Sequence, residues 1–384
     1  MSAPDTESTA GGPDGGSGVS GEPSRRRIRV ALVFGGRSSE HAISCATAGG
    51  VLSAIDRDRY EVVPIGVTRE GAFVLERDDP AAFALDPAAL PEVRDDGSRV
   101  RWPASIAERE LMLEAPDGSR RSLGSVDVAF PILHGPFGED GTIQGMFELI
   151  GVPYVGNGVL ASALGMDKHF TKTLLEAAGV PVAPWVTLGP TDRTGDSAYL
   201  RRRVEGLGYP VFVKPARAGS SVGVTRVTGE EGLDAALDVA FAEDSRVLVE
   251  RQMVGREIEC GVLGDLAGGA PRISVAGEIV VTGRDFYDFD AKYLDAPGVD
   301  LVCPASLTDR EHAELQRIAA RAFQAIDGRG LARVDVFLTE SGFVVNEINT
   351  MPGFTPVSMF PRCWQQSGVG YPELIDTLIR LALL

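Results

Sequence analysis

Four polar side chains near the C-terminus have the spacing of two paired β-strands. Arg333 and Asp335 alternate along one Val-rich segment, and Glu347 and Asn349 alternate along the next. Side chains alternate between the two faces of a strand, so each pair shares a face. A three-residue loop with Gly342 in the left-handed region would place Asp335 opposite Glu347 and Arg333 opposite Asn349. Two carboxylates and an amide oxygen suit Mg²⁺, so the pattern predicts a magnesium–nucleotide site; the alternative is a hairpin whose polar face meets water.

A strand that ends in lysine predicts a phosphate site. The apolar run 209–213 leads to Lys214, and the small-residue loop 216–224 follows. Successive backbone N–H groups in such a loop, with a lysine beside them, suit a polyphosphate. The loop is not a Walker loop, because no Gly-Lys-Ser/Thr follows it. A plain hairpin tip is the alternative.

Two further candidates follow buried strands in the N-terminal third. The run 29–34 leads through two glycines to a helix start near Glu40, and the run 127–133 ends at His134. Small ligands bind at the carboxyl ends of strands in open α/β sheets. Glu40 either accepts a substrate ammonium or only complements the helix dipole, and the sequence does not separate the two. His134 has the same two readings, ligand contact or structural histidine.

One motif points to a different class of protein. Residues 156–161 match the dinucleotide pattern G-x-G-x-x-A, which would support a nicotinamide-dependent dehydrogenase. That motif also requires an acid at the end of the next strand, about 20 residues further on. Glu176 stands near that position but inside a helical run, and the predicted strand 185–188 ends without an acid. We therefore disfavour the dehydrogenase.

Composition limits the classes of partner. The 384 residues are 44% hydrophobic and 24% charged, which is typical of a soluble protein of two or three domains. A net charge of −17 argues against nucleic acid and anionic membranes as partners. The sequence has no run suited to a signal peptide or a membrane span, so we expect a cytoplasmic protein. The four widely spaced cysteines are expected to be free thiols.

The pattern of apolar runs predicts an α/β fold. Strands are expected at 29–34, 60–67, 127–133, 185–188, 209–215 and 247–253, and an amphipathic helix at 309–326. Residues 1–24 are expected to be disordered. Residues 76–125 have weak periodicity and predict little. Residues 282–300 mix aromatic, acidic and glycine residues and are expected to form a lid loop.

Several separate motifs, in order, resemble the D-alanine–D-alanine ligases, which are ATP-grasp enzymes of peptidoglycan synthesis. The matching segments are 35–40, 134–141, 166–168, 214–223, 291–294, 333–335 and 346–353. The resemblance implies a three-domain α/β ATP-grasp fold with an N-terminal open parallel-sheet (pre-ATP-grasp) domain. Its parts would be the substrate domain 25–156, the central subdomain 157–250 and the C-terminal subdomain 251–384, which carries the lid.

The resemblance also implies an ATP site between the central and C-terminal parts. Lys168, Lys214 and Lys292 would contact the phosphates beside Ser220 and Ser221. Glu250 and Met253 would line the adenine slot, and Glu257 would hold the ribose. Asp335, Glu347 and Asn349 would bind two Mg²⁺ ions, with Mn²⁺ as a substitute.

The implied reaction joins two D-alanines. ATP would phosphorylate the first to an acylphosphate, and the amine of the second would displace phosphate. Glu40 would anchor the first ammonium and His134 would contact substrate. Arg333 and the Gly353 N–H would stabilise the tetrahedral oxyanion, and Ser358 would take the second carboxylate. Glu40, Ser220 and Tyr293 would form the hydrogen-bonded set that closes the lid.

Alternatives remain within and outside this family. A D-alanyl-D-lactate or D-alanyl-D-serine ligase shares the chemistry, although Tyr293 in the lid favours D-alanine over D-lactate as second substrate. A non-catalytic nucleotide-binding regulator would have lost Arg333 or the metal ligands, which this sequence keeps. A homodimer is expected only from the resemblance.

Overall fold

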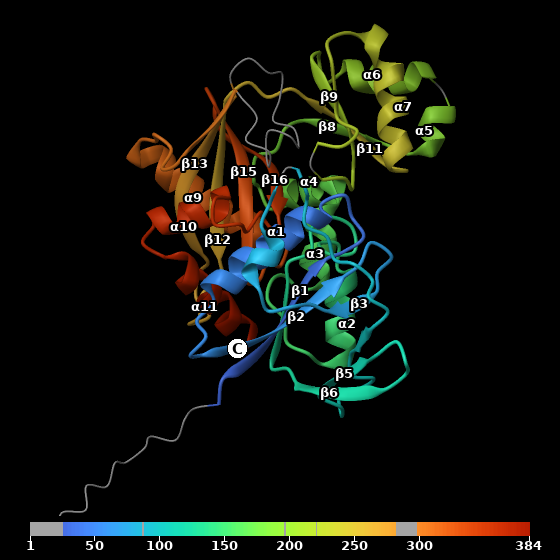
Figure 1. The fold of residues 1–384 in the computed structure, drawn as a ribbon. Coiled ribbons are helices and arrows are strands. Elements are labelled where there is room, and N and C mark those ends of the chain that lie inside the picture. Colours follow the sequence, from blue (N-terminus) through green and yellow to red (C-terminus); the bar gives the residue numbers. More distant parts are fainter. Residues whose placement is uncertain (1–25, 87, 196, 220, 282–297) are drawn as a thin grey trace, which may run out of the picture.

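The computed structural model describes residues 26–86, 88–195, 197–219, 221–281 and 298–384. The predicted disordered tail, most of the predicted lid, and Ser220, Lys292 and Tyr293 lie outside these residues. Within the described residues the strands form three sheets of four or five strands and one small sheet (Figure 1). No helix among them is long and apolar enough to cross a lipid bilayer.

The first sheet contains the predicted N-terminal strands. Its order is β3-β2-β1-β7, with β1 parallel to both β2 and β7. The short strand β3 is an antiparallel edge that the sequence did not predict. The bounds are β1 (Ile28–Gly35), β2 (Tyr60–Val67), β3 (Phe73–Leu75) and β7 (Val128–Pro131). Helix α1 (His41–Ala54) packs against β1.

A small antiparallel sheet occupies the region where the sequence predicted little. It follows a 3₁₀ turn at Pro80–Phe83, and its strands are β4 (Arg99–Arg101), β5 (Glu110–Glu114) and β6 (Arg120–Ser125). No side chain of β6 is fully buried and half of them are exposed, and charged pairs such as Arg120–Glu114 cross the sheet. Because few of these residues are buried, the apolar alternation that marks a strand is weak.

The second sheet is antiparallel and has helices on one face. Its order is β10-β9-β11-β8. The strands are β8 (Trp185–Leu188), β9 (Val211–Pro215), β10 (Thr225–Val227) and β11 (Val247–Arg251); the helices are α5 (Pro190–Thr194), α6 (Ser197–Glu205) and α7 (Leu233–Glu243). Val213 and Val249 join the core under α6 and α7. Alternation then turns their neighbours Lys214 and Glu250 to the opposite face.

The third sheet is a five-stranded antiparallel sheet covered by α9. Its order is β14-β13-β12-β15-β16. The bounds are β12 (Arg256–Leu263), β13 (Arg272–Val281), β14 (Val299–Val302), β15 (Leu331–Thr339), β16 (Gly342–Asn349) and α9 (Asp309–Ala325). Helix α9 begins with a Thr308–Glu311 capping box and buries Leu315 and Ile318 against the sheet. It matches the predicted helix within one residue.

The hairpin β15–β16 has the predicted pairing but a different turn. Asp335 lies opposite Glu347 and Arg333 opposite Asn349, as predicted. The predicted three-residue loop is wrong, because Thr339 pairs with Gly342 and leaves a two-residue turn. The register instead shifts by one residue between Asp335 and Val336. A bulge of this kind changes which side chains of β16 face the cavity side of the sheet.

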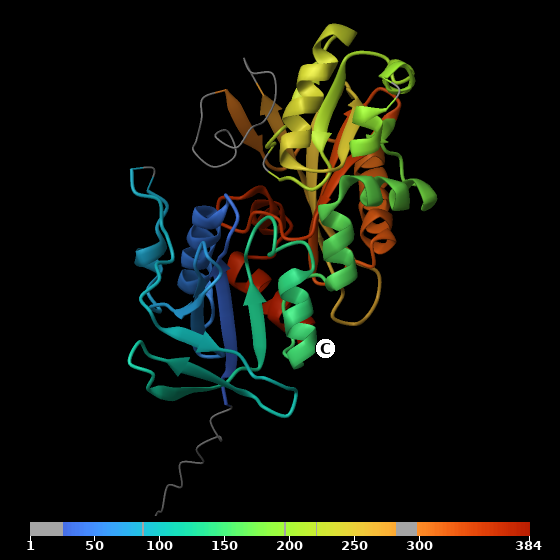
Figure 2. The same ribbon diagram turned by 90° about the vertical axis from the view of Figure 1, so that its right-hand side faces the viewer.

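The C-terminal helices return to the N-terminal sheet. Helices α10 (Met359–Gln366) and α11 (Tyr371–Ala382) contribute Trp364 and Ile375 to the same core as Val30 and Leu32 of β1 (Figure 1). Tyr60 Oη donates to Asp376 of α11 over 2.6 Å. The connecting helices α2 (Thr142–Ile150), α3 (Val159–Met166) and α4 (Lys168–Ala177) run from the first sheet toward the second (Figure 2).

Candidate active site

One cavity of about 810 Å³ collects the predicted residues that the structure describes. It is bordered by the first sheet's loops, the second sheet and the hairpin β15–β16. The predicted residues that line it are Glu40, His134, Lys168, Lys214, Ser221, Glu250, Met253, Glu257, Arg333, Asp335, Glu347, Asn349, Gly353 and Ser358. Residues more than 300 positions apart in the chain therefore face one space.

The hairpin presents its oxygen donors together. Asn349 Nδ2 donates to Asp335 Oδ2 over 2.8 Å and lies 3.5 Å from Glu347 Oε1. Arg333 donates two hydrogen bonds to Asp335, from Nε to Oδ1 and from Nη2 to Oδ2, each over 2.7 Å. Two carboxylates and one amide oxygen on adjacent strands form an oxygen-rich group of the kind that suits Mg²⁺.

Arg333 is held between carboxylates of neighbouring strands. Besides Asp335, its Nε lies 3.2 Å from Oε2 of Glu259, which the sequence analysis had given no role. Glu259 stands on β12 opposite Asp335. Burial alone would lower the pKa of Arg333, but Asp335 and Glu259 outweigh it and raise the pKa well above its ordinary value. The guanidinium is thus a fixed positive charge in the cavity wall.

A buried glutamate lies between two lysines at the second sheet. Glu250 Oε1 is 3.1 Å from Lys214 Nζ, and Glu250 Oε2 is 2.7 Å from Lys172 Nζ. Burial alone would raise the pKa of Glu250, but the two ammonium groups outweigh it and lower the pKa. Lys172 was not among the predicted site residues. Its only signal was the four-residue spacing from Lys168, which puts both lysines on one side of α4.

The start of α4 is tied to the small-residue loop. Asp167 caps the helix by accepting from the N–H groups of His169 and Phe170. Lys168 donates to the Ala218 carbonyl from Nζ over 2.7 Å, and to the Ala216 carbonyl from its backbone N–H over 3.0 Å. The loop after β9 and the first turn of α4 therefore form one wall beside Lys214.

Glu40 lies where two glycine loops meet. A β-carbon at Gly135 would lie 3.1 Å from Glu40 Oε2, and one at Gly219 would lie 3.5 Å from the same atom. The loop after β7 and the loop after β9 thus both approach this carboxylate. Glu40 takes the N-cap position of α1, but its side chain makes no cap hydrogen bond there. Side-chain capping therefore does not account for its position.

His134 lies beside Glu139, a residue to which the sequence pattern assigned no role. Nδ1 of the imidazole is 3.6 Å from Glu139 Oε1. Burial alone would lower the pKa of His134, but Glu139 outweighs it and raises the pKa. Burial raises the pKa of Glu139, against the opposing effect of His134. The pair can hold a proton within the cavity wall.

Gly353 and Ser358 lie together beyond the end of β16. Ser358 takes the N-cap position of α10, and its Oγ is 2.7 Å from Thr355 Oγ1. A β-carbon at Gly353 would lie 3.2 Å from Ser358 Oγ, so a larger residue there would crowd the hydroxyl. A backbone N–H and a hydroxyl are therefore available at one end of the cavity.

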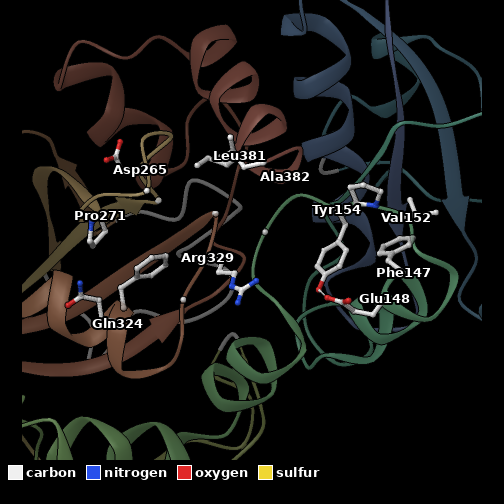
Figure 3. Close-up of a pocket in the computed structure, with 18 of the residues that line it drawn as sticks. Phe147, Glu148, Val152, Tyr154, Asp265, Pro271, Gln324, Arg329, Leu381 and Ala382 are labelled. Atoms are coloured by element: carbon white, nitrogen blue, oxygen red, sulfur yellow. Dashed lines mark hydrogen bonds between the residues drawn. The ribbon is translucent and has the colours of Figure 1, made fainter. Parts of the chain in front are cut away.

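A second cavity of about 600 Å³ lies elsewhere and is lined by none of the residues predicted for ATP, metal or substrate, although Gly156 of the dinucleotide-like motif borders it (Figure 3). Glu148 and Tyr154 line one side, joined by a 2.9 Å hydrogen bond, and Gln324 and Arg329 line the other. It lacks the convergent carboxylates and lysines of the first cavity.

The dinucleotide-like motif proves to be a docking loop. Asn157 is buried and donates from Nδ2 to the carbonyls of Leu331 and Thr350 over 2.6 and 2.8 Å. Its Oδ1 accepts from the Arg329 N–H over 2.8 Å. A β-carbon at Gly330 would lie 2.9 Å from the Gly156 carbonyl oxygen. The absence of a side chain at Gly330 thus allows its backbone to approach the backbone of the motif.

Two family models match the chain. The model described as "D-ala D-ala ligase N-terminus" matches residues 29–157, and the model described as "D-ala D-ala ligase C-terminus" matches residues 174–380. A D-alanine–D-alanine ligase from Kineococcus radiotolerans is 57% identical over 372 residues, covering 94% of this chain and 98% of the relative. One from Pseudarthrobacter chlorophenolicus is 52% identical over 369 residues, covering 95% and 97%.

Solved structures agree with the sequence relatives. The VanG D-Ala:D-Ser ligase from Enterococcus faecalis matches with a TM-score of 0.80 at 33% identity, covering 93% of this chain and 100% of that one. The D-alanine–D-alanine ligase from Coxiella burnetii matches with a TM-score of 0.77 at 35% identity, covering 93% and 94%. The predicted three-domain α/β ATP-grasp fold is confirmed, and the chain belongs to the D-alanine–D-alanine ligase family.

Proposed function

We propose that this protein joins two D-alanines to D-alanyl-D-alanine, with conversion of ATP to ADP and phosphate, for peptidoglycan precursor synthesis. One observation carries the proposal: the hairpin set of Arg333, Asp335, Glu347 and Asn349 faces the same cavity as Lys214. Relatives of this chain at more than 50% identity are named D-alanine–D-alanine ligase, which supports D-alanine as the substrate.

The chemistry requires an activated carboxylate. A free carboxylate is a poor electrophile, so phosphoryl transfer from ATP to the first D-alanine gives an acylphosphate and ADP. The amine of the second D-alanine then attacks that carbonyl, the C–O bond to phosphate breaks, and the amine loses a proton. Fixed positive charges stabilise the phosphoryl group and the tetrahedral oxyanion. Arg333 and the Gly353 N–H are the groups we assign to the oxyanion.

The nucleotide is assigned to the side of the cavity under the second sheet. Lys168, Lys214 and Ser221 are proposed at the phosphates, and Ser220 and Lys292 join them on the sequence resemblance alone. Glu250 and Met253 are assigned to adenine and Glu257 to the ribose; all three line the cavity. The tie between Lys168 and the small-residue loop supports this placement.

The metal ligands are assigned to the hairpin. The carboxylates of Asp335 and Glu347 converge on the Asn349 amide, whose Nδ2 lies 2.8 Å from one and 3.5 Å from the other, so the three residues bring carboxylate and amide groups together and fit two Mg²⁺ ions, with Mn²⁺ as a substitute. Bound metal would supply positive charge to the transferring phosphoryl group. Arg333 fixes the carboxylate of Asp335, which limits the rotation that this ligand can make.

The two D-alanines are assigned to the opposite side. Glu40 is proposed to accept the first ammonium, with His134 beside it, and Ser358 to take the second carboxylate. Tyr293 is proposed to close the lid with Glu40 and Ser220. The approach of both glycine loops to Glu40 Oε2 supports a carboxylate placed for a ligand.

A D-alanyl-D-serine or D-alanyl-D-lactate ligase is the second candidate. The structural relative from Enterococcus faecalis is a D-Ala:D-Ser ligase, at 33% identity. The relatives at 52% and 57% identity are named D-alanine–D-alanine ligases, which favours D-alanine here.

Three wider expectations are also proposals. The domains are divided at 25–156, 157–250 and 251–384, with the lid at 282–300. The protein acts in the cytoplasm on small-molecule substrates. It forms a homodimer, an expectation that rests on the resemblance alone. Light scattering in solution tests the last of these.

Phosphate release with ATP, Mg²⁺ and D-alanine tests the proposed function. Release should require all three, and mass spectrometry should detect the dipeptide. Faster ATP consumption with D-serine or D-lactate than with D-alanine would show that D-alanine is not the preferred second substrate. ATP binding without turnover would favour a non-catalytic regulator. Binding of a nicotinamide nucleotide, with indifference to ATP, would favour a dehydrogenase.

A further inference from the structure

We propose that Lys172 is a positioning residue that sets nucleotide affinity and the preference for adenine. It neutralises Glu250 from outside the cavity, so that Lys214 keeps its positive charge for phosphate and Glu250 stays ionised toward the base. This inference rests on the proposed nucleotide site.

The contacts place the two lysines on different oxygens of one carboxylate. Lys172 Nζ lies 2.7 Å from Glu250 Oε2, and Lys214 Nζ lies 3.1 Å from Oε1. Glu250 and Lys214 line the cavity of about 810 Å³, whereas Lys172 does not. Lys172 is only 1% exposed. It therefore acts on the cavity through Glu250 and cannot be a direct phosphate ligand in this arrangement.

The position of Lys172 is fixed by its surroundings. It projects from α4 four residues after Lys168, and its Nζ lies 5.7 Å from the centre of the Trp185 ring. Trp185 pairs with Glu250 across β8 and β11. The ammonium is thus held between an aromatic ring and a carboxylate on neighbouring strands, a site that suits a cation.

The combined charge of Lys172, Glu250 and Lys214 determines how strongly this wall attracts phosphate. Burial lowers the pKa of Lys172, and the ionised Glu250 beside it opposes that effect and favours the ammonium form. With both lysines protonated, one carboxylate between two ammonium groups leaves a net charge of +1, available on the cavity side at Lys214. Without Lys172, Glu250 has Lys214 as its nearest cation, and the pair becomes neutral. A phosphate chain would then lose an attractive charge, because Lys214 is engaged by Glu250.

The same loss would weaken base selection. An ionised carboxylate accepts a hydrogen bond from the exocyclic amine of adenine and repels the carbonyl oxygen that guanine carries at that position. A buried Glu250 with one counter-charge has a higher pKa than one with two, so its neutral form becomes more accessible. The neutral form can donate a hydrogen bond and discriminates less against guanine.

The alternative is that the Lys172–Glu250 pair only stabilises the fold. Removal of one partner of a buried ion pair is destabilising wherever the pair lies, so a loss of stability alone does not separate the two roles. A purely structural role predicts a lower Tm with both KM values unchanged or changed equally, whereas a positioning role predicts a selective rise in the KM for nucleotide.

The test compares Lys172→Met with Lys172→Arg in the full-length protein. For Lys172→Met we expect the KM for ATP to rise on the order of 10-fold and the KM for D-alanine to stay within about 2-fold. The ratio of kcat/KM for ATP over GTP should fall on the order of 10-fold. Lys172→Arg keeps the positive charge, so its KM for ATP and its ATP-over-GTP ratio should be close to those of the wild type.

A destabilising control separates structure from positioning. Tyr60→Phe removes the partly buried hydrogen bond to Asp376, and neither residue lines the cavity, so it should lower the Tm and leave both KM values unchanged. If Lys172→Met changes only the Tm, like this control, or changes both KM values equally, the proposal is overturned. If Lys172→Met does not fold, Lys172→Gln replaces it.

Calorimetric titration with ATP and GTP keeps this proposal distinct from the proposed function. Wild type that binds ATP but does not ligate D-alanine would overturn the function, while weaker ATP binding by Lys172→Met would still support the role of Lys172. Equal ATP affinity of wild type and Lys172→Met, with an unchanged ATP-to-GTP ratio, would overturn the role. Wild type that does not bind ATP would overturn both.

Discussion

Arg333 holds Asp335 through two hydrogen bonds of 2.7 Å, from Nε to Oδ1 and from Nη2 to Oδ2. One residue separates Arg333 from Asp335 along β15, so the two side chains share the face toward the cavity. A planar guanidinium matches a carboxylate in this geometry, whereas a lysine would offer a single point charge. The pair joins the proposed oxyanion site to the proposed metal site.

Arg333→Ala should abolish ligation and leave ATP binding largely intact. Loss of one preorganised oxyanion donor costs on the order of 10²–10³-fold in rate. Phosphate release measures the rate, and calorimetry measures ATP binding. The substitution also leaves Asp335 and Glu259 without their shared cation, so stability should fall by about 3–5 kcal/mol. Equal loss of ligation and ATP binding, with Arg333→Lys unable to restore either, would indicate a structural role.

Glu347→Gln should raise the Mg²⁺ concentration needed for half-maximal activity by about 10-fold or more. The change keeps the shape of the side chain but replaces an anionic ligand by a neutral one, and a hard cation prefers the anion. A metal titration at saturating ATP and D-alanine measures it. Glu340→Gln, at the exposed turn of the same hairpin, is the matched control. Identical Mg²⁺ curves for the two variants would contradict the metal assignment.

Asn157→Ala should destabilise the fold by about 3 kcal/mol. It leaves the Leu331 and Thr350 carbonyls and the Arg329 N–H without their side-chain partner, and an unsatisfied buried polar group costs about 1–3 kcal/mol. Denaturant unfolding measures the loss. Asn157→Asp keeps the acceptor but removes both donated bonds, so it should destabilise as well. A loss below about 1 kcal/mol for both variants would show that the docking loop does not depend on this amide.

Local periodicity predicts much of this fold, and it fails where the contacts are long-range. Strand β8 has the predicted bounds, because its residues pack in a sheet and a glycine ends the run. The pairing of Asp335 with Glu347 also follows from alternation. Alternation does not predict the one-residue register shift between Asp335 and Val336, because the register is set by the whole sheet and not by the hairpin alone.

Two of the site residues that the sequence missed act through partners distant in the chain, whereas the third, Glu139, meets the nearby His134. Lys172 meets Glu250, 78 positions away by subtraction (250 − 172), and Glu259 meets Arg333 across two strands. A buried lysine on a helix has no local signature, because its pattern is that of any amphipathic helix. The motif resemblance predicted residues that face the cavity, but it did not predict Lys172 and Glu259, the charged residues that pair with them.

The pKa of His134 should depend on Glu139. Burial alone would lower the pKa of this imidazole below its ordinary 6.5, and the nearby carboxylate reverses the direction and raises it. Because the folded-state pKa is raised, the stability from protonated His134 is fully present below pH 6.5 and is lost as pH rises through the raised value. Glu139→Gln removes the main raising effect, so the titration midpoint should fall.

Proton–carbon NMR of protein labelled at histidine measures the midpoint, and His134→Gln assigns the resonance. Glu231→Gln, an exposed change in the part of the chain that carries the second sheet, should leave the midpoint in place. A wild-type midpoint below 6.5, or one that Glu139→Gln does not lower, would contradict the pairing. The raised pKa keeps a larger fraction of His134 protonated near neutral pH, beside the carboxylate of Glu40, so Glu139→Gln should also shift the pH dependence of kcat/KM for D-alanine in the same direction.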